Sequence, residues 1–156
     1  MKLYFLRHGQ ADWPDWDRPD DERPLTKKGK KETRRVANLL CDLGVKPAII
    51  LSSPLPRAFQ TARIAARRLG IELREEADLG KEFSLPRLRK LISECHGEDL
   101  MVVGHEPNFS AVVKQLTGGR VEMAKAGVAC LKLNAPKGGG TILWVVTPKI
   151  AKTFAK

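Results

Sequence analysis

Two histidines and two arginines stand where they could bind and transfer a phosphoryl group. Arg7 and His8 follow one apolar run of the chain, Arg57 lies shortly after a second run, and His105 follows a third. A neutral imidazole can attack phosphorus, and a guanidinium group can hold two oxygens of one phosphate. These residue types therefore indicate a phosphate pocket that contains a nucleophile, if the fold brings them together.

The apolar pattern predicts the elements that would position these side chains. Strands are expected at Lys2–Arg7, Ala48–Ser52, Ile71–Arg74, Leu100–Gly104, Val128–Leu133 and Thr141–Thr147, the last two as an antiparallel edge. Helices are expected from the N-cap Thr26 to about Leu43, from about Arg57 to Leu69, around Leu88–Cys95, and from Pro107 onward. The inner face of the first helix is expected to carry Val36, Leu39, Leu40 and Leu43. Gly44 and Gly70 are expected to end the first two helices.

The alternation of strands and helices predicts an α/β fold. We expect a three-layer sandwich, with a mostly parallel central sheet flanked by helices. The length of 156 residues indicates a single domain, residues 1–156. Ligands of such sheets bind beyond the carboxyl ends of the strands, which is where Arg7, His8 and His105 stand. Arg57 and His105 also lie near expected helix starts, whose unpaired N–H groups attract phosphate.

The chain is strongly basic, with a formal net charge of +10 and a pI near 9.8. This balance favours polyanionic partners, and the expected first and second helices carry clusters of basic residues: Lys27, Lys28, Lys30, Lys31, Arg34, Arg35, Arg63, Arg67 and Arg68. A solvated helix face is the usual explanation, and a docking surface for an acidic protein is the alternative. The absence of any DNA- or RNA-binding motif argues against nucleic acid as the partner.

Several other classes of protein are not expected. No apolar run reaches the roughly 20 residues of a membrane helix, and the first residues lack the features of a signal peptide, so we expect a cytoplasmic protein with no membrane partner. Cys41, Cys95 and Cys130 are odd in number and far apart, which argues against a disulfide framework or a zinc cluster. No Gly-rich nucleotide loop or carboxylate cluster is present, so no metal or cofactor is expected.

Motifs along most of the chain resemble the histidine phosphatase superfamily, also called the phosphoglycerate mutase-like family. The segments that carry the resemblance are Leu6-Arg7-His8-Gly9, Arg23-Pro24-Leu25-Thr26 with Gly29, Ser52-Ser53-Pro54 with Arg57-Ala58 and Thr61-Ala62, and Val103-Gly104-His105-Glu106-Pro107. The short length and the loop before Arg23 are most similar to the small SixA-type branch, whose named member is a phosphohistidine phosphatase. The resemblance implies a phosphoglycerate mutase-like fold.

The resemblance also implies a role for each pocket residue. His8 would be the nucleophile that becomes phosphorylated, and water would then hydrolyse the phosphohistidine. Arg7 and Arg57 would clamp the phosphoryl oxygens, and His105 would donate a hydrogen bond to them. Gly9 would orient the ring of His8 through its carbonyl group. In the SixA-type branch, Arg23 would add a further positive contact.

Two positions depart from the wider family. Position 10 is Gln, where relatives often carry an acidic residue. Larger members use a carboxylic acid to protonate the leaving group, and Glu82 is the candidate by spacing, with a solvated loop residue as the alternative. A phosphohistidine or phosphoramidate needs less help from such an acid than an alkyl phosphate does.

The function predicted from these residues is metal-independent phosphatase activity through a phosphohistidine intermediate on His8. The expected substrate is a phosphohistidine in a protein, since the short chain has no room for the insertions that enclose the substrate in mutases. A small phosphorylated metabolite is the alternative substrate, and a phosphate- or phosphopeptide-binding module without turnover is the alternative function. Cations around His8 should lower its pKa and keep it neutral and reactive at mildly acidic pH.

Overall fold

A six-stranded sheet organises the part of the chain that the computed structural model describes, residues 1–135 and 137–155. Its strands are β1 Lys2–Arg7, β2 Ile49–Ser52, β3 Leu73–Glu75, β4 Leu100–Gly104, β5 Val128–Leu133 and β6 Gly140–Val146. The spatial order is β3-β2-β4-β1-β5-β6. Neighbours from β3 to β1 are parallel, and the pairs β1–β5 and β5–β6 are antiparallel. The mostly parallel sheet with an antiparallel edge, expected from the sequence, is confirmed.

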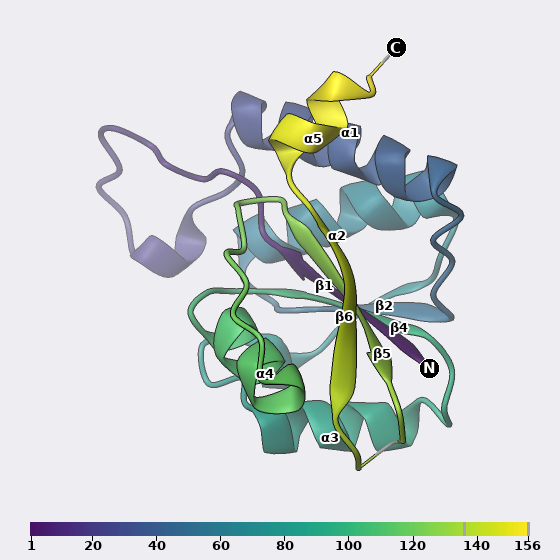
Figure 1. Cartoon of the computed structure of the whole chain (residues 1–156). Helices are drawn as coiled ribbons and strands as arrows, with labels where there is room; N and C mark the ends of the chain where they lie inside the picture. The colour runs from purple at the N-terminus through teal and green to yellow at the C-terminus, as the bar shows by residue number, and fades with distance from the viewer. Residues whose placement is uncertain (136, 156) are drawn as a thin grey trace.

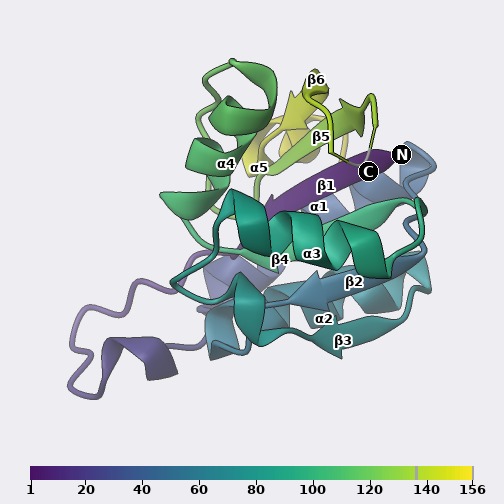
Figure 2. The ribbon, with the colours of Figure 1, turned by 90° about the horizontal axis from the view of Figure 1, so that it is seen from below.

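Helices cover both faces of this sheet (Figures 1 and 2). They are α1 Lys27–Asp42, α2 Pro56–Leu69, α3 Leu85–Glu94, α4 Asn108–Thr117 and α5 Pro148–Thr153, with short 3-10 turns η1 Asp20–Glu22 and η2 Ala77–Leu79. The views agree that α1, α2 and α5 lie on one face and that α3 and α4 lie on the other. The α/β sandwich predicted from the alternation of elements is therefore confirmed.

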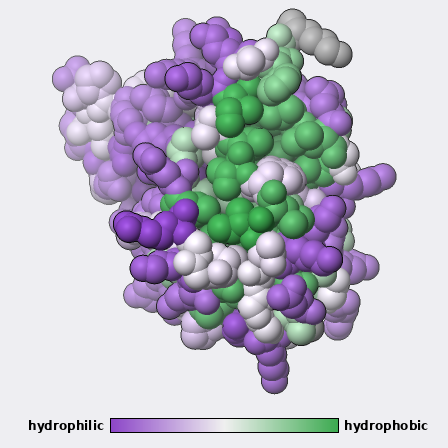
Figure 3. Space-filling view, in the orientation of Figure 1, coloured by the Kyte–Doolittle hydropathy of each residue, from purple (hydrophilic) through white to green (hydrophobic). Residues whose placement is uncertain are grey.

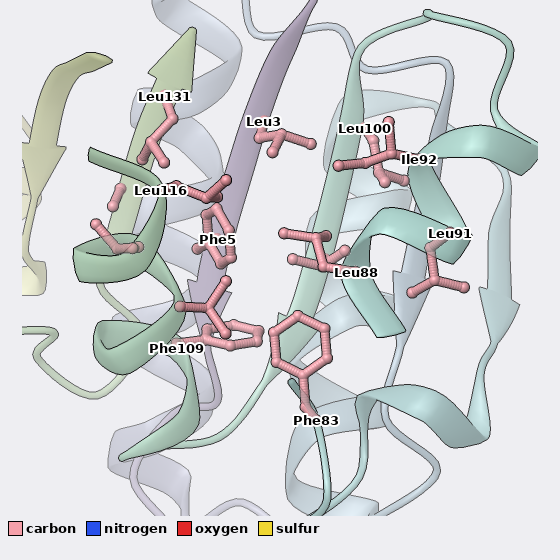
Figure 4. Packing of buried hydrophobic residues seen from close by; sticks show 14 of the residues in the cluster. Leu3, Phe5, Phe83, Leu88, Leu91, Ile92, Leu100, Phe109, Leu116 and Leu131 are labelled. Carbon is pink, nitrogen blue, oxygen red and sulfur yellow. The ribbon is translucent and has the colours of Figure 1, made fainter. Parts of the chain in front are cut away.

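The central strands are apolar throughout because both of their faces are buried. Along β1, Leu3 and Phe5 face the core under α3 and α4, while Tyr4 and Leu6 face the core under α1 and α2. Figure 4 shows the first of these cores, where the ring of Phe109 packs edge-on against Phe5 at 5.2 Å between centroids. These two cores fix the strands whose ends carry the polar residues.

Three differences from the sequence expectations stand out, while the remaining helix and strand ends lie within three residues of the expected ones. Leu43 is 53% exposed because α1 ends at Asp42 and Leu43 caps it. The third strand is Leu73–Glu75 and starts two residues later than expected. Helix α5 was not expected, since six residues are too few to show a helical period. Gly44 and Gly70 both have positive φ and follow the helices that they were expected to end.

Two surface features bear on function. The segment between β1 and α1 forms a long loop that projects from the body of the molecule (Figure 1). Figure 3 shows a large apolar patch on the face of the molecule that Figure 1 presents, surrounded by hydrophilic residues. Strand β6 forms one edge of the sheet. Leu143 of β6 is 43% exposed there. Among the described helices, none has the length and apolar character needed to cross a membrane.

Candidate active site

The two pocket histidines lie side by side because their strands are neighbours. Strands β1 and β4 are parallel and in register, with Arg7 opposite Gly104. The backbone N–H of His8 donates to the carbonyl of Gly104 at 3.0 Å. The rings of His8 and His105 consequently face each other with centroids 5.3 Å apart and planes at 50°. Residues nearly a hundred positions apart thus meet at the carboxyl end of the sheet.

The ring of His8 is held in one orientation by the residue that follows it. Its Nδ1 lies 2.7 Å from the carbonyl oxygen of Gly9. A carbonyl only accepts, so Nδ1 carries the proton and the lone pair of neutral His8 is on Nε2. The N–H of Gly9 in turn donates to Oγ1 of Thr61 on α2 at 2.9 Å. A Cβ at Gly9 would come within 2.7 Å of Oγ1 of Thr33, so only glycine fits against α1 here.

Burial sets the protonation state of His8. The residue is only 8% exposed, and burial lowers its pKa to about 4, with smaller contributions from Arg57, Arg7 and Lys125. The carbonyl of Gly9 acts in the opposite direction, but it does not offset burial. The lowering that the sequence predicted is confirmed, although desolvation and not the cations is its largest cause. His8 is therefore neutral at physiological pH.

His105 is buried as well, and a serine from a third strand end orients it. Nε2 of His105 lies 2.8 Å from Oγ of Ser53, which follows β2. The same Oγ accepts the N–H of Leu55 at 3.2 Å, so its own hydrogen can be donated to Nε2. Neutral His105 then carries its proton on Nδ1, available to an anion. Burial, followed by the neighbouring His8, lowers the pKa of His105 to about 3.

Two arginines carry buried donors without acceptors. Arg7 donates from Nη1 to the carbonyl of Met123 at 2.8 Å, and Arg57 donates from Nη1 to the carbonyl of Asp20 at 3.1 Å. The Nε atoms of both side chains are buried and have no hydrogen-bond partner in the described structure. Buried donors are normally satisfied, and an oxyanion is the partner that a guanidinium group suits best. The geometry is thus that of an anion site beside His8.

A carboxylate from the projecting loop joins two of the arginines, and sequence reasoning missed it. Oδ1 of Asp20 accepts Nε of Arg23 at 2.8 Å, and its Oδ2 lies 3.6 Å from Nη2 of Arg57. Arg23 also donates to the carbonyl of Ala11 at 2.6 Å. Arg23 is therefore linked to the pocket through Asp20. The clustered aspartates of the loop were the only signal for this contact, since the path of the loop is not encoded in any periodicity.

Further acidic residues of the loop pair with lysines around the pocket. Asp12 lies 2.5 Å from Nζ of Lys125, and Asp21 forms an ion pair with Lys81. Gln10, the position that departs from the family pattern, turns its side chain to the hydroxyl of Thr26 at the start of α1. The loop is thus fastened at several points around the mouth of the pocket.

Glu82, the candidate acid, lies on the surface. Its side chain is 83% exposed, and Oε2 lies 3.4 Å from Nη2 of Arg87 on α3. No contact joins it to His8 or His105 within the described residues. Among those residues, no group of three or more His, Cys, Asp or Glu side chains is arranged to hold a metal ion.

Comparisons with known proteins agree with this geometry. A sequence profile described as "Histidine phosphatase superfamily (branch 1)" matches residues 3–89. An uncharacterized protein of Picosynechococcus sp. is 37% identical over 146 residues, which cover 88% of each chain. A phosphoglycerate mutase of Thermobifida fusca is 36% identical over 75 residues, which cover 44% of this chain and 29% of the mutase.

A solved structure extends the likeness to the whole fold. The protein histidine phosphatase SixA, in complex with tungstate, superimposes with a TM-score of 0.84 at 27% sequence identity. The superposition covers 96% of this chain and 98% of that one. The profile match includes Arg7, His8 and Arg57 but ends before His105. The superposition, in contrast, extends over nearly the whole chain.

Proposed function

This chain belongs to the histidine phosphatase superfamily and is a phosphatase, and from that premise we propose that it hydrolyses protein phosphohistidine through an intermediate on His8. We take residues 1–156 as one such domain. The observation that carries the proposal combines His8, whose Nδ1 is bound to the carbonyl of Gly9 and leaves the lone pair on Nε2, with Arg7 and Arg57, whose charges act on its pKa. The buried Nε atoms of both arginines have no hydrogen-bond partner among the described residues. The SixA structure that resembles this chain holds tungstate, which is also an oxyanion.

In the first step, Nε2 of His8 attacks phosphorus, and the bond from phosphorus to the substrate's imidazole nitrogen breaks. Arg7, Arg57 and His105 hold the phosphoryl oxygens and offset the charge that they carry. The substrate's imidazole departs as a neutral ring if its second nitrogen already carries a proton. No side-chain acid is then required, which agrees with the exposed position of Glu82.

In the second step, water attacks the phosphorus of the phosphorylated His8 and releases inorganic phosphate. The proton that His8 keeps on Nδ1, bonded to the carbonyl of Gly9, lets its ring depart from phosphorus as a neutral imidazole. The proton of the attacking water passes to phosphate or solvent. Arg23, held by Asp20, adds positive charge at the pocket mouth.

The test compares the wild type with His8→Asn on phosphohistidine peptides, p-nitrophenyl phosphate, sugar phosphates and nucleotides, all in the presence of a chelator. We expect the wild type to favour phosphohistidine and to form an acid-labile, base-stable phosphoenzyme, which the variant lacks. His96→Asn is the matched control, since His96 is exposed and has a positive φ of 52° that Asn tolerates. Full activity of His8→Asn would overturn the mechanism, and preference for a sugar phosphate would overturn the substrate. Phosphate binding by the wild type without turnover would indicate a binding module.

A further inference from the structure

A surface groove leads away from the pocket between α1 and α5. Its first part, from Arg7 at the pocket to Lys149 on α5, is lined by Lys28, Lys125 and Pro148 among others. Its second part shares Lys28, Glu32, Pro148 and Lys149 with the first and continues along both helices. The shared residues make the two hollows one path, which begins at a proposed phosphate ligand.

Basic side chains line this groove from end to end. They number seven, against two acidic ones, and comprise Arg7, Lys28, Lys31, Arg35, Lys125, Lys149 and Lys152. The two acidic residues are Asp12, which is paired with Lys125, and Glu32, which lines both parts of the groove. Among the described residues, no ion pair forms at Lys31, Arg35 or Lys152. The groove therefore carries positive charge that the chain itself does not neutralise.

The loop between β1 and α1, which is fastened around the mouth of the pocket, has the opposite sign. The loop between β1 and α1 carries six acidic residues, Asp12, Asp15, Asp17, Asp20, Asp21 and Glu22, against two basic ones, Arg18 and Arg23. Asp12, Asp20 and Asp21 are paired with basic residues. A macromolecule that brings a phosphoryl group to His8 therefore meets a loop with further acidic residues as well as the basic groove. An acidic stretch next to the phosphorylated residue would be directed towards α1 and α5.

We propose that the groove between α1 and α5 binds an acidic segment of the phosphorylated protein substrate. This inference rests on the proposed function and adds to it a recognition site outside the phosphate pocket. Lys28, Lys31 and Arg35 recur on one face of α1 and span about 10 Å along the helix axis. That length suits about three extended residues, so a few Asp or Glu side chains near the phosphohistidine would be enough.

The residues that line the groove favour a protein over a nucleic acid as its binding partner. Single strands are bound by aromatic side chains on which the bases stack, in addition to positive charge. No Phe, Tyr or Trp lines either part of the groove. The acidic loop would also repel a long polyanion that extended over it.

The test uses Lys31→Gln/Arg35→Gln/Lys152→Gln, which leaves every proposed pocket residue in place. Two phosphohistidine peptides are compared, one with glutamates and one with glutamines on a single side of the phosphohistidine. The pair is made in two versions, with these residues N-terminal or C-terminal to the phosphohistidine. We expect the wild type to show a KM roughly tenfold lower for the glutamate peptide, since three exposed ion pairs contribute about 0.5 kcal/mol each. The variant should lose this preference and keep its rate on p-nitrophenyl phosphate.

The matched control removes the same charge elsewhere, as Lys46→Gln/Lys114→Gln/Lys132→Gln, three exposed lysines outside the groove. If the control lost the preference for the glutamate peptide to the same extent, net charge alone would explain the effect and the proposed site would be overturned. A wild type that showed no preference for the glutamate peptide would overturn it as well. Fluorescence anisotropy with an unphosphorylated glutamate-rich peptide tests the groove even if no phosphohistidine is hydrolysed, and unaltered binding by the variant would overturn it. If an oligonucleotide of equal charge bound more tightly than the glutamate-rich peptide, the partner of the groove would be a nucleic acid and not a protein.

Discussion

The ring of His8 depends for its reactivity on its own backbone and on burial. The carbonyl of Gly9 fixes the proton on Nδ1 and leaves Nε2 free, while burial keeps the ring neutral. The arginines nearby contribute less to that neutrality than the loss of water does. His8 therefore needs no general base, because the lone pair on its Nε2 is available to attack phosphorus at any pH above about 5.

Burial of the two histidines should make folding sensitive to acid. The pKa values of about 4 for His8 and about 3 for His105 lie below the roughly 6.5 of an unfolded histidine. Below about pH 6.5 the unfolded chain therefore binds more protons than the folded one, and stability falls as the pH falls towards about 4. Urea unfolding at about pH 7 and about pH 5 should show that His8→Gln loses about 1–2 kcal/mol less over this interval than the wild type. His96→Asn, at an exposed site, should behave as the wild type, and equal losses in all three proteins would contradict the assignment.

The carboxylate of Asp20 should compete with phosphate for Arg57. Its Oδ2 lies 3.6 Å from Nη2 of Arg57, and the backbone carbonyl of Asp20 accepts a hydrogen bond from Nη1 of Arg57. Asp20→Asn keeps the carbonyl contact and removes the charge, so inorganic phosphate should inhibit about 2–5-fold more strongly, in line with an exposed ion pair. Inhibition constants are to be measured beside Asp15→Asn, an exposed neighbour on the same loop. Weaker inhibition in Asp20→Asn would mean that the carboxylate mainly positions Arg57.

At the scale of elements, the junction of β1 and α1 has no spare room. A Cβ on Gly29, in the first turn of α1, would lie 2.1 Å from the carbonyl oxygen of Gln10, two residues after His8. Alanine would favour the helix by about 1 kcal/mol, but forcing the two backbones apart costs about 1–3 kcal/mol. Gly29→Ala should therefore lower both the free energy of unfolding and kcat, measured by urea unfolding and steady-state kinetics. Lys30→Ala, at an exposed position one residue on, should change neither, and an unaffected Gly29→Ala would contradict this packing.

The elements that the sequence predicted best are those buried on both faces. Strands β1, β4 and β5 have the expected bounds, since an apolar run without alternation marks a strand between two helical layers. Strand β3 has three residues, none of them buried, and it gave a weak pattern. The partners of the pocket residues, such as Ser53 for His105, depend on where loops cross the sheet, which local patterning does not specify.

At the scale of the molecule, topology brings the proposed site together. Strands β1, β2 and β4 are neighbours in the sheet although they are remote in sequence, so their polar ends converge at one edge. The rule that ligands bind at this edge was enough to expect that convergence. The net charge was also evident from composition, but its concentration along the groove was not, because α5 supplies Lys149 and Lys152 and was not expected.

The open edge at β6 has a consequence for the protein in concentrated solution. Leu143 is exposed on β6, whose outer edge pairs with no other strand in the described part of the chain, and such an edge can add a strand from another molecule. A net charge of +10 keeps copies apart at low ionic strength, but the Debye length shrinks from about 10 Å at 0.1 M salt to about 3 Å at 1 M. Sedimentation velocity should therefore show reversible self-association that grows with salt and that Leu143→Lys removes. A sedimentation coefficient independent of salt would mean that the irregular pairing of β6 beside Leu143 already protects this edge from association.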